Sequence, residues 1–144
     1  MWLKVLSLFD GMSCGQIALK NIQLKVDEYF ASEIDKHAIY VAKTNFPEMI
    51  HLWDIKWLDY SNWFCDFDIL IWWSPCQWFS RSWKWLNFND PRSALFFEYV
   101  RLLKETKPKY FFLENVVMKK EWQNVISDYL WIQPIKINSW LLTA

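Results

Sequence analysis

The sequence predicts an α/β fold, in which a mostly parallel β-sheet carries helices on both faces. Short apolar runs typical of buried strands alternate along the chain with segments whose apolar residues recur at helical spacing. Polar or small residues directly follow most of the strand-like runs, as expected where parallel strands end at a ligand-binding edge. The 144 residues are enough for one domain with its own core.

Each element can be placed from its local pattern. Apolar runs predict strands at 3–8, 29–32, 50–52, 67–71, 110–113 and 132–137. Apolar residues at helical spacing predict helices at 16–21, 36–46, 94–104 and 119–130. Pro47 closes the second of these helices, and Asp90-Pro91-Arg92-Ser93 is typical of a helix start. The alternation of the two kinds of element favours a single sheet covered by helices.

Composition excludes several classes of protein. Basic and acidic residues balance at 16 each, so no global field draws the chain to nucleic acid or membrane. No apolar stretch reaches the roughly 18 residues of a membrane span, and the segment 1–10 becomes acidic too early for a secretory signal. The three cysteines contain no Cys-x-x-Cys pair, which argues against a disulfide framework or a metal site. A reducing, cytoplasmic setting fits these features best.

Chemically useful residues follow the predicted strands. They are Gly11, Glu33, Asp54, Cys76 and Glu114. The carboxyl ends of parallel strands lie at one edge of a sheet, so these residues are expected to gather there. Any one of them alone is weak evidence, but the set of five is much less expected by chance.

The first turn suits a polar ligand. Residues 9–15 form a Gly-containing turn between a strand and a helix, which presents backbone N–H groups at a helix start. Glu33 stands 22 positions after Gly11, near where an acidic residue holds a ribose hydroxyl in nucleotide-binding folds. The alternative is a turn that serves packing only.

Cys76 is a candidate nucleophile. Pro75 fixes one backbone dihedral and favours extended geometry at Ser74, which places the thiol just past a strand end. A cysteine becomes reactive when its surroundings lower its pKa; the alternative is a buried structural cysteine. Glu114 is a candidate acid if it is buried, or else a helix-capping or salt-bridged carboxylate.

Five stretches, in this order, resemble the catalytic domain of C5-cytosine DNA methyltransferases. They are Phe9-Asp10-Gly11 with Gly15, Glu33, Asp54-Ile55, Ser74-Pro75-Cys76-Gln77 and Glu114-Asn115-Val116. The Phe-Asp-Gly form and the segment 92–98 look closest to the branch shared by phage enzymes and animal de novo enzymes. The pairing of Ser-Pro-Cys with Glu-Asn-Val is the most specific part of the resemblance, which covers nearly the whole chain.

The resemblance implies a Rossmann-like S-adenosylmethionine-dependent methyltransferase fold. Glu33 would take the ribose hydroxyls of S-adenosylmethionine, Asp54 and Ile55 would hold the adenine, and Leu95 would pack against the cofactor. The full set expected to bind the cofactor is Phe9, Asp10, Gly11, Met12, Ser13, Cys14, Glu33, Asp54, Ile55, Pro75 and Leu95.

The resemblance also implies the reaction. The substrate would be double-stranded DNA, with the target cytosine flipped out of the helix. The Cys76 thiolate would attack C6 of the base, and Glu114 would bind the N3 and exocyclic amine region. C5 would take the methyl group, and a base would remove the C5 proton to release Cys76. The chemistry needs a soft nucleophile that can also leave, which favours a thiolate.

The family pattern continues past residue 139 with a Gln-Asn-Arg-x-Arg motif, a DNA-reading domain and a closing motif, none of which the chain contains. We therefore expect residues 1–144 to be a partial catalytic domain, truncated at its C-terminus and without a target-recognition domain. It would be inactive unless a second polypeptide supplies the rest. The alternatives are an inactive methyltransferase-like partner, a tRNA cytosine-5 methyltransferase and a generic nucleotide-binding module; the oligomeric state stays open.

Tryptophan is in excess and glycine in deficit. About 7% glycine is usual, or roughly ten residues here, whereas the chain has 2 Gly and 12 Trp. Trp72, Trp73 and Trp78 flank the Pro-Cys step where the family has glycine. Other tryptophans stand where glycine suits the pattern or a helix end: Trp53, Trp83, Trp85 and Trp131. Either these tryptophans are real and the protein is an altered relative, or UGA codons meaning glycine were translated as tryptophan; the matching deficit and excess favour the second.

Overall fold

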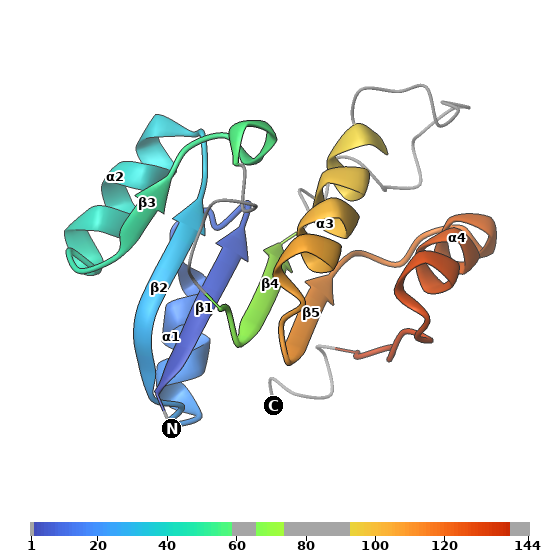
Figure 1. Cartoon of the computed structure of the whole chain (residues 1–144), viewed down its shortest axis with the longest axis horizontal. Helices are drawn as coiled ribbons and strands as arrows, with labels where there is room; N and C mark the ends of the chain where they lie inside the picture. The colour runs from blue at the N-terminus through green and yellow to red at the C-terminus, as the bar shows by residue number, and fades with distance from the viewer. Residues whose placement is uncertain (1, 59–65, 74–92, 139–144) are drawn as a thin grey trace.

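The computed structural model describes residues 2–58, 66–73 and 93–138. Within them lies a five-stranded, all-parallel sheet of order β3-β2-β1-β4-β5, with all five arrowheads toward the same edge in Figure 1. The strands are β1 (Leu3–Leu8), β2 (Val26–Ser32), β3 (Ile50–Leu52), β4 (Ile69–Trp73) and β5 (Tyr110–Glu114). The helices are α1 (Cys14–Asn21), α2 (Lys36–Asn45), α3 (Ser93–Thr106) and α4 (Lys120–Leu130), with a short 3₁₀ turn η1 (Ile55–Trp57).

β1 lies at the centre of the sheet. It pairs with β2 on one side and with β4 on the other, and Val5, Leu6 and Leu8 are fully buried. The chain adds β2 and β3 on one side of β1 before it crosses to β4 and β5 on the other. In open α/β sheets such a reversal of strand order opens a crevice at the carboxyl ends of the strands, where ligands bind.

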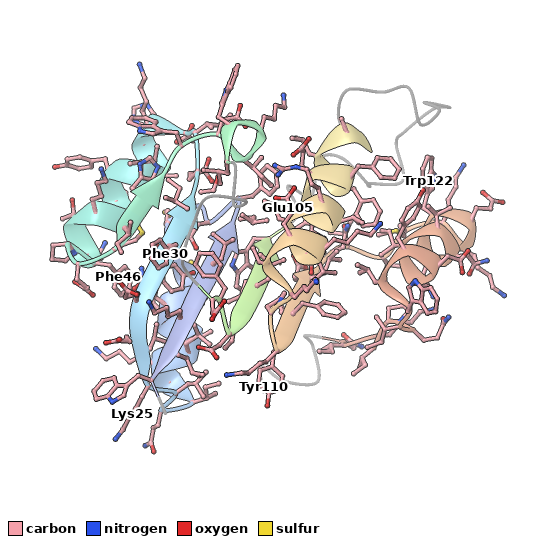
Figure 2. The ribbon with its side chains drawn as sticks, viewed as in Figure 1. Lys25, Phe30, Phe46, Glu105, Tyr110 and Trp122 are labelled. Atoms are coloured by element: carbon pink, nitrogen blue, oxygen red, sulfur yellow. The ribbon has the colours of Figure 1, made fainter. Side chains whose placement is uncertain are left out.

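Successive side chains of β1 and β4 point to opposite faces of the sheet and enter two separate cores. Leu6, Leu8, Leu70 and Trp72 pack with Phe96, Tyr99, Val100 and Leu102 of α3. Val5 and Ile71 face the other side, where Ala42 of α2 and Leu19 of α1 pack. Phe30 belongs to the first core and Phe46 to the second (Figure 2). The predicted arrangement, a parallel sheet with helices on both faces, is therefore confirmed.

The predicted strand at 132–137 is wrong. Residues 132–138 form no strand, and they are exposed. Pro134 has no N–H to give to a strand ladder, and within the described residues the outer edge of β5 is unpaired. Tyr110, the first residue of β5, is 66% exposed at this edge (Figure 2). An apolar run therefore does not by itself predict a strand, because a strand also needs a neighbouring strand to pair with.

Candidate active site

A cavity of about 360 Å³ lies at the carboxyl edge of the sheet. It is lined by Phe9, Ser32, Glu33, Ile34, Asp54, Ile55, Lys56, Trp73 and Leu95. These residues follow or end β1, β2, β3 and β4, or lie on α3. Five of the residues predicted to bind the cofactor therefore meet in one cavity, although they span most of the chain.

Glu33 joins two of the loops that border this cavity. Its Oε2 accepts a hydrogen bond of 2.9 Å from the backbone N–H of Gly11, in the loop after β1. Its Oε1 accepts from the backbone N–H groups of Ile34 and Asp35, at 2.7 and 2.9 Å. Each carboxylate oxygen has two lone pairs, so Oε2 can still accept a ligand hydroxyl.

The loop between β1 and α1 is held by a buried carboxylate. Asp10 is only 4% exposed, and its side chain accepts hydrogen bonds from the hydroxyls of Ser13 and Tyr29, the latter at 2.6 Å. Burial raises the pKa of Asp10, and the hydroxyl donors act in the opposite direction. Phe9, Gly11 and Ser13 all have left-handed backbone conformations, with φ of 55°, 58° and 63°. Left-handed conformations are uncommon in residues other than glycine. They persist only where contacts such as these hydrogen bonds to Asp10 hold the backbone in place.

The ends of β2 and β3 are also tied together. The hydroxyl of Ser32 donates to the carbonyl oxygen of Trp53 at 2.6 Å. His51 Nε2 lies 3.0 Å from the carbonyl oxygen of Glu33, so this nitrogen carries the proton. Asp54, just past β3, caps η1 by accepting from the N–H of Lys56 at 3.0 Å. These contacts orient Glu33 and Asp54 from two adjacent strand ends toward one space.

Ile55 closes the floor of the cavity. It is 2% exposed and belongs to the core that packs under α3. Nη2 of Arg101 on α3 lies 3.4 Å from the carbonyl oxygen of Ile55, and the guanidinium is held by Glu98 and Glu105 at 2.7 Å each. Burial lowers the pKa of Arg101, but the two carboxylates together outweigh it and raise the value. This network joins α3, which carries Leu95, to the turn that carries Asp54.

Glu114 ends β5 and pairs in register with Trp73, the last residue of β4. The predicted convergence of these two strand ends is therefore confirmed. Of the two readings left open for Glu114, the buried acid does not hold among the described residues, because Glu114 is exposed on the edge strand. Pro75 and Cys76, and with them the predicted nucleophile, lie outside the described residues.

The two tryptophans before the Pro-Cys step point in opposite directions. Trp72 is 1% exposed and packs with Phe96 and Tyr99, at ring-centroid distances of 5.6 and 4.8 Å. Although it flanks the Pro-Cys step in sequence, Trp72 therefore faces the core and not the cavity. Trp73 does line the cavity. Trp78, Trp83 and Trp85 lie outside the described residues.

Sequence patterns missed several residues of the site. Tyr29, Ser32 and Lys56 contact the site residues or line the cavity. Tyr29 and Ser32 lie inside β2, where their residue types gave no signal beyond a strand. Within the described part of the chain, Met12 and Cys14 are exposed and do not line the cavity.

The cavity has the properties of a nucleoside site. Its volume falls within the range of about 300–1,000 Å³ usual for small-molecule pockets, and apolar Phe9, Ile55 and Leu95 stand beside the carboxylates of Glu33 and Asp54. Apolar side chains suit a flat base, and carboxylates accept hydrogen bonds from ribose hydroxyls and amino groups. The described residues contain no cluster of three or more metal-ligating side chains. Nor do they contain a helix long and apolar enough to cross a membrane.

A family model described as C-5 cytosine-specific DNA methylase matches residues 3–126. The chain belongs to this family. It is 41% identical over 116 residues to the orphan methyltransferase M.Rho11sI of Bacillus phage rho11s, a match that covers 79% of this chain and 23% of that protein. It is 43% identical over 113 residues to the type II methyltransferase M1.ScrFI of Lactococcus lactis subsp. cremoris, covering 78% and 28%. The chain thus spans about a quarter of the length of these curated relatives.

Solved structures of this methylase family's fold agree with the architecture. The structure is similar to a mutant of DNMT2 from Spodoptera frugiperda, with a TM-score of 0.67 and 31% identity, covering 89% of this chain and 40% of that one. The Dnmt2 methyltransferase of S. pombe also has a TM-score of 0.67, at 23% identity and with 90% and 39% covered, and indicates the fold alone. The predicted Rossmann-like methyltransferase fold is confirmed by these matches.

Proposed function

We propose that this chain forms the cofactor-binding and nucleophile-bearing part of a DNA (cytosine-5-)-methyltransferase that uses S-adenosylmethionine. The observation that carries the proposal is the cavity at the carboxyl edge, in which Phe9, Glu33, Asp54, Ile55 and Leu95 meet. Family membership supports the reaction class. The three cysteines include no Cys-x-x-Cys pair, and this pattern also favours a reducing, cytoplasmic setting.

S-adenosylmethionine supplies the methyl group when it is bound. Glu33 accepts hydrogen bonds from the ribose hydroxyls, with its carboxylate already oriented by the N–H groups of Gly11, Ile34 and Asp35. Asp54 accepts from the adenine amino group, and Ile55 packs against the base. The loop that contains Asp10 and Gly11 would hold the remainder of the cofactor, and Leu95 on α3 would pack against it.

The chain's remaining chemistry acts on a cytosine flipped out of double-stranded DNA. The Cys76 thiolate would form a bond to C6, which raises the electron density at C5. C5 would then take the methyl group as the S–CH3 bond of the sulfonium breaks and the donor leaves as a neutral thioether. Removal of the C5 proton restores the ring double bond and breaks the S–C6 bond. Glu114 binds the N3 and exocyclic amine edge and stabilises the charge that develops there.

Covalent geometry supports this pairing of Cys76 with Glu114. Trp73 and Glu114 are register partners, and neighbouring strands lie about 4.8 Å apart. Cys76 follows Trp73 by three residues, and three residues reach at most about 11 Å. The length of the chain therefore allows the thiol to reach the strand end that carries Glu114.

Substitution of the nucleophile tests the proposal. We expect Cys76→Ser to abolish methyl transfer in the complete product of the gene and to leave the affinity for S-adenosylmethionine unchanged, because serine is a poorer nucleophile and leaving group. Cys65→Ser is the matched control, since Cys65 lies outside the motifs. The measurements are transfer of labelled methyl groups and calorimetry of cofactor binding. Unchanged turnover of Cys76→Ser would contradict the proposal.

Covalent trapping separates the enzyme from its alternatives. DNA that carries 5-fluorocytosine cannot lose a proton from C5, so an active enzyme stays attached to it through Cys76. We expect a trapped complex with DNA and none with Cys76→Ser. Trapping on tRNA alone would identify the tRNA enzyme instead. Cofactor binding without trapping on either substrate would identify an inactive partner.

A further inference from the structure

We propose that Tyr29 is a positioning residue for the cofactor: its hydroxyl fixes the carboxylate of Asp10 and thereby the loop between β1 and α1. The proposal rests on the proposed function and adds a residue that no motif contains. Tyr29 lies inside β2, in register with Val5 of β1, and is 5% exposed. Its ring packs in the core beneath α1 and α2, so only the hydroxyl reaches the loop.

The hydroxyl lies at the centre of a polar cluster. It donates to Oδ1 of Asp10 at 2.6 Å, while the Ser13 hydroxyl donates to Oδ2. Asp10 and Ser13 are both buried, and the N–H of Ser13 also donates to the carbonyl oxygen of Asp10 at 3.0 Å. The hydroxyl of Ser13 is therefore used within the loop and makes no cap to α1. Asp10 thus holds the loop conformation with both of its carboxylate oxygens.

Gly15 lets the hydroxyl come this close. A Cβ added at Gly15 would lie 2.8 Å from the Tyr29 oxygen, closer than real Cβ atoms approach other atoms. The chain has only 2 Gly, and both lie next to this cluster. Gly11 has φ of 58° and donates its N–H to Glu33, which links the cluster to the ribose-binding carboxylate.

The physical consequence is a loop that is formed before the cofactor arrives. A loop ordered in advance does not lose conformational entropy on binding, so affinity rises. The sulfonium and ammonium groups of S-adenosylmethionine, if held beside this loop, would favour an ionised Asp10. Burial raises the pKa of Asp10, the hydroxyls of Ser13 and Tyr29 that donate to its carboxylate lower it, and the negative charge of Glu33 raises it further.

Tyr29→Phe removes only the hydroxyl and keeps the ring in the core. We expect it to weaken the binding of S-adenosylmethionine by about tenfold, the scale of a lost hydrogen bond to a buried charge. Asp10 then keeps its proton to higher pH, so the loss of affinity on acidification begins at a higher pH than in the unsubstituted chain. The matched control is Tyr40→Phe, which removes the same atom from a side chain that is 73% exposed on α2.

A second measurement needs no cofactor. In a chain made to the printed sequence, isotope-labelled glycine gives two backbone amide signals, because Gly11 and Gly15 are its only glycines. We expect the Gly11 amide to exchange with solvent faster in Tyr29→Phe than in the unsubstituted chain. Gly15→Ala, which displaces the Tyr29 hydroxyl, should also speed the exchange of the Gly11 amide. The two substitutions together should increase this exchange by less than the sum of their separate effects.

Three results would contradict the positioning role of Tyr29 or the proposed function. Affinity within twofold of the unsubstituted chain, with an unmoved pH profile, would overturn the positioning role even if the melting temperature fell. A Tyr29→Phe chain that does not fold would also overturn it, because the hydroxyl would then be needed for the fold itself. If the unsubstituted chain binds no S-adenosylmethionine, the proposed function fails, and the exchange of Gly11 still decides whether Tyr29 sets the loop.

Discussion

Glu33 connects two loops through one side chain. Its carboxylate accepts backbone N–H groups from its own loop and from Gly11, which lies 22 positions earlier. Unpaired backbone N–H groups near a cavity are costly, so the carboxylate stabilises the loops as well as offering lone pairs to a ligand. Glu33 therefore both stabilises the loops of the site and can accept hydrogen bonds from a ligand.

We expect Glu33→Gln to weaken the binding of S-adenosylmethionine by at least tenfold, because the amide has one acceptor oxygen and no charge. Calorimetry of cofactor binding measures the effect. Glu28→Gln is the control, since Glu28 forms an ion pair with Lys4 away from the cavity at 2.6 Å. Equal loss of affinity in both variants would contradict a direct role of Glu33.

Asp68 acts at the opposite edge of the sheet, at the start of β4. It accepts from Lys109 Nζ at 2.6 Å and from the N–H of Lys4 at 3.0 Å, and these donors lower its pKa. A carboxyl whose pKa is lower in the folded state contributes stability above its ordinary value of about 3.9. That contribution is lost as the pH falls through the lower, folded value.

We therefore expect Asp68→Asn to reduce the free energy of unfolding at neutral pH by roughly 0.5–1 kcal/mol, the scale of a partly exposed ion pair. The difference from the unsubstituted chain should shrink as the pH falls below about 4. Urea denaturation over a series of pH values measures it, with Asp27→Asn on β2 as a surface control. A difference that does not change with pH would show that charge is not the cause.

At the scale of elements, α4 ends in a conformation that favours glycine. Trp131, which ends the helix, has φ of 57° and ψ of 30°, and its side chain is 93% exposed. A side chain in this left-handed region costs about 1–2 kcal/mol, and an exposed indole recovers little of that by burial. Helices commonly end with glycine at this position for the same reason.

We expect Trp131→Gly to raise the free energy of unfolding by about 0.5–1 kcal/mol, once the greater freedom of glycine in the unfolded chain is subtracted. Trp122→Gly, in the first turn of the same helix, should lower it by about 1 kcal/mol, because glycine is a poor helix former. Chemical denaturation of both variants makes the comparison. If Trp131→Gly were destabilising, the indole would have contacts that outweigh its backbone strain.

At the scale of the whole molecule, the structure bears on whether some of the tryptophans are glycines in the native protein, encoded by UGA codons that were translated as tryptophan. Trp72 and Trp73 both have a buried indole N–H with no hydrogen-bond partner among the described residues. Each such group costs about 1–3 kcal/mol. The left-handed Trp131 and the low glycine content favour the decoding hypothesis, and the unpaired indole of Trp73 adds to them. Trp72 gives no such support, because its ring fills the core beside Phe96 and Tyr99 and glycine there would leave a cavity.

We expect the intact mass of the protein isolated from its source to be lower than the printed sequence gives, by the difference between a tryptophan and a glycine residue at several positions. Peptide sequencing by mass spectrometry would identify the positions. Trp122, in the first turn of α4, should remain tryptophan. A mass that equals that of the printed sequence would rule out the decoding hypothesis.

The sequence by itself determined the parallel sheet, its helices and the family, because apolar periodicity and residues such as Glu33 and Asp54 after strands are local signals. Only the tertiary structure decided that Tyr29 holds Asp10, that Trp72 faces the core and that residues 132–137 form no strand. These facts depend on which segments, distant along the chain, become neighbours. The role of a hydroxyl inside a strand depends on which segment lies beside it. Whether a run of apolar residues forms a strand likewise depends on a neighbouring strand.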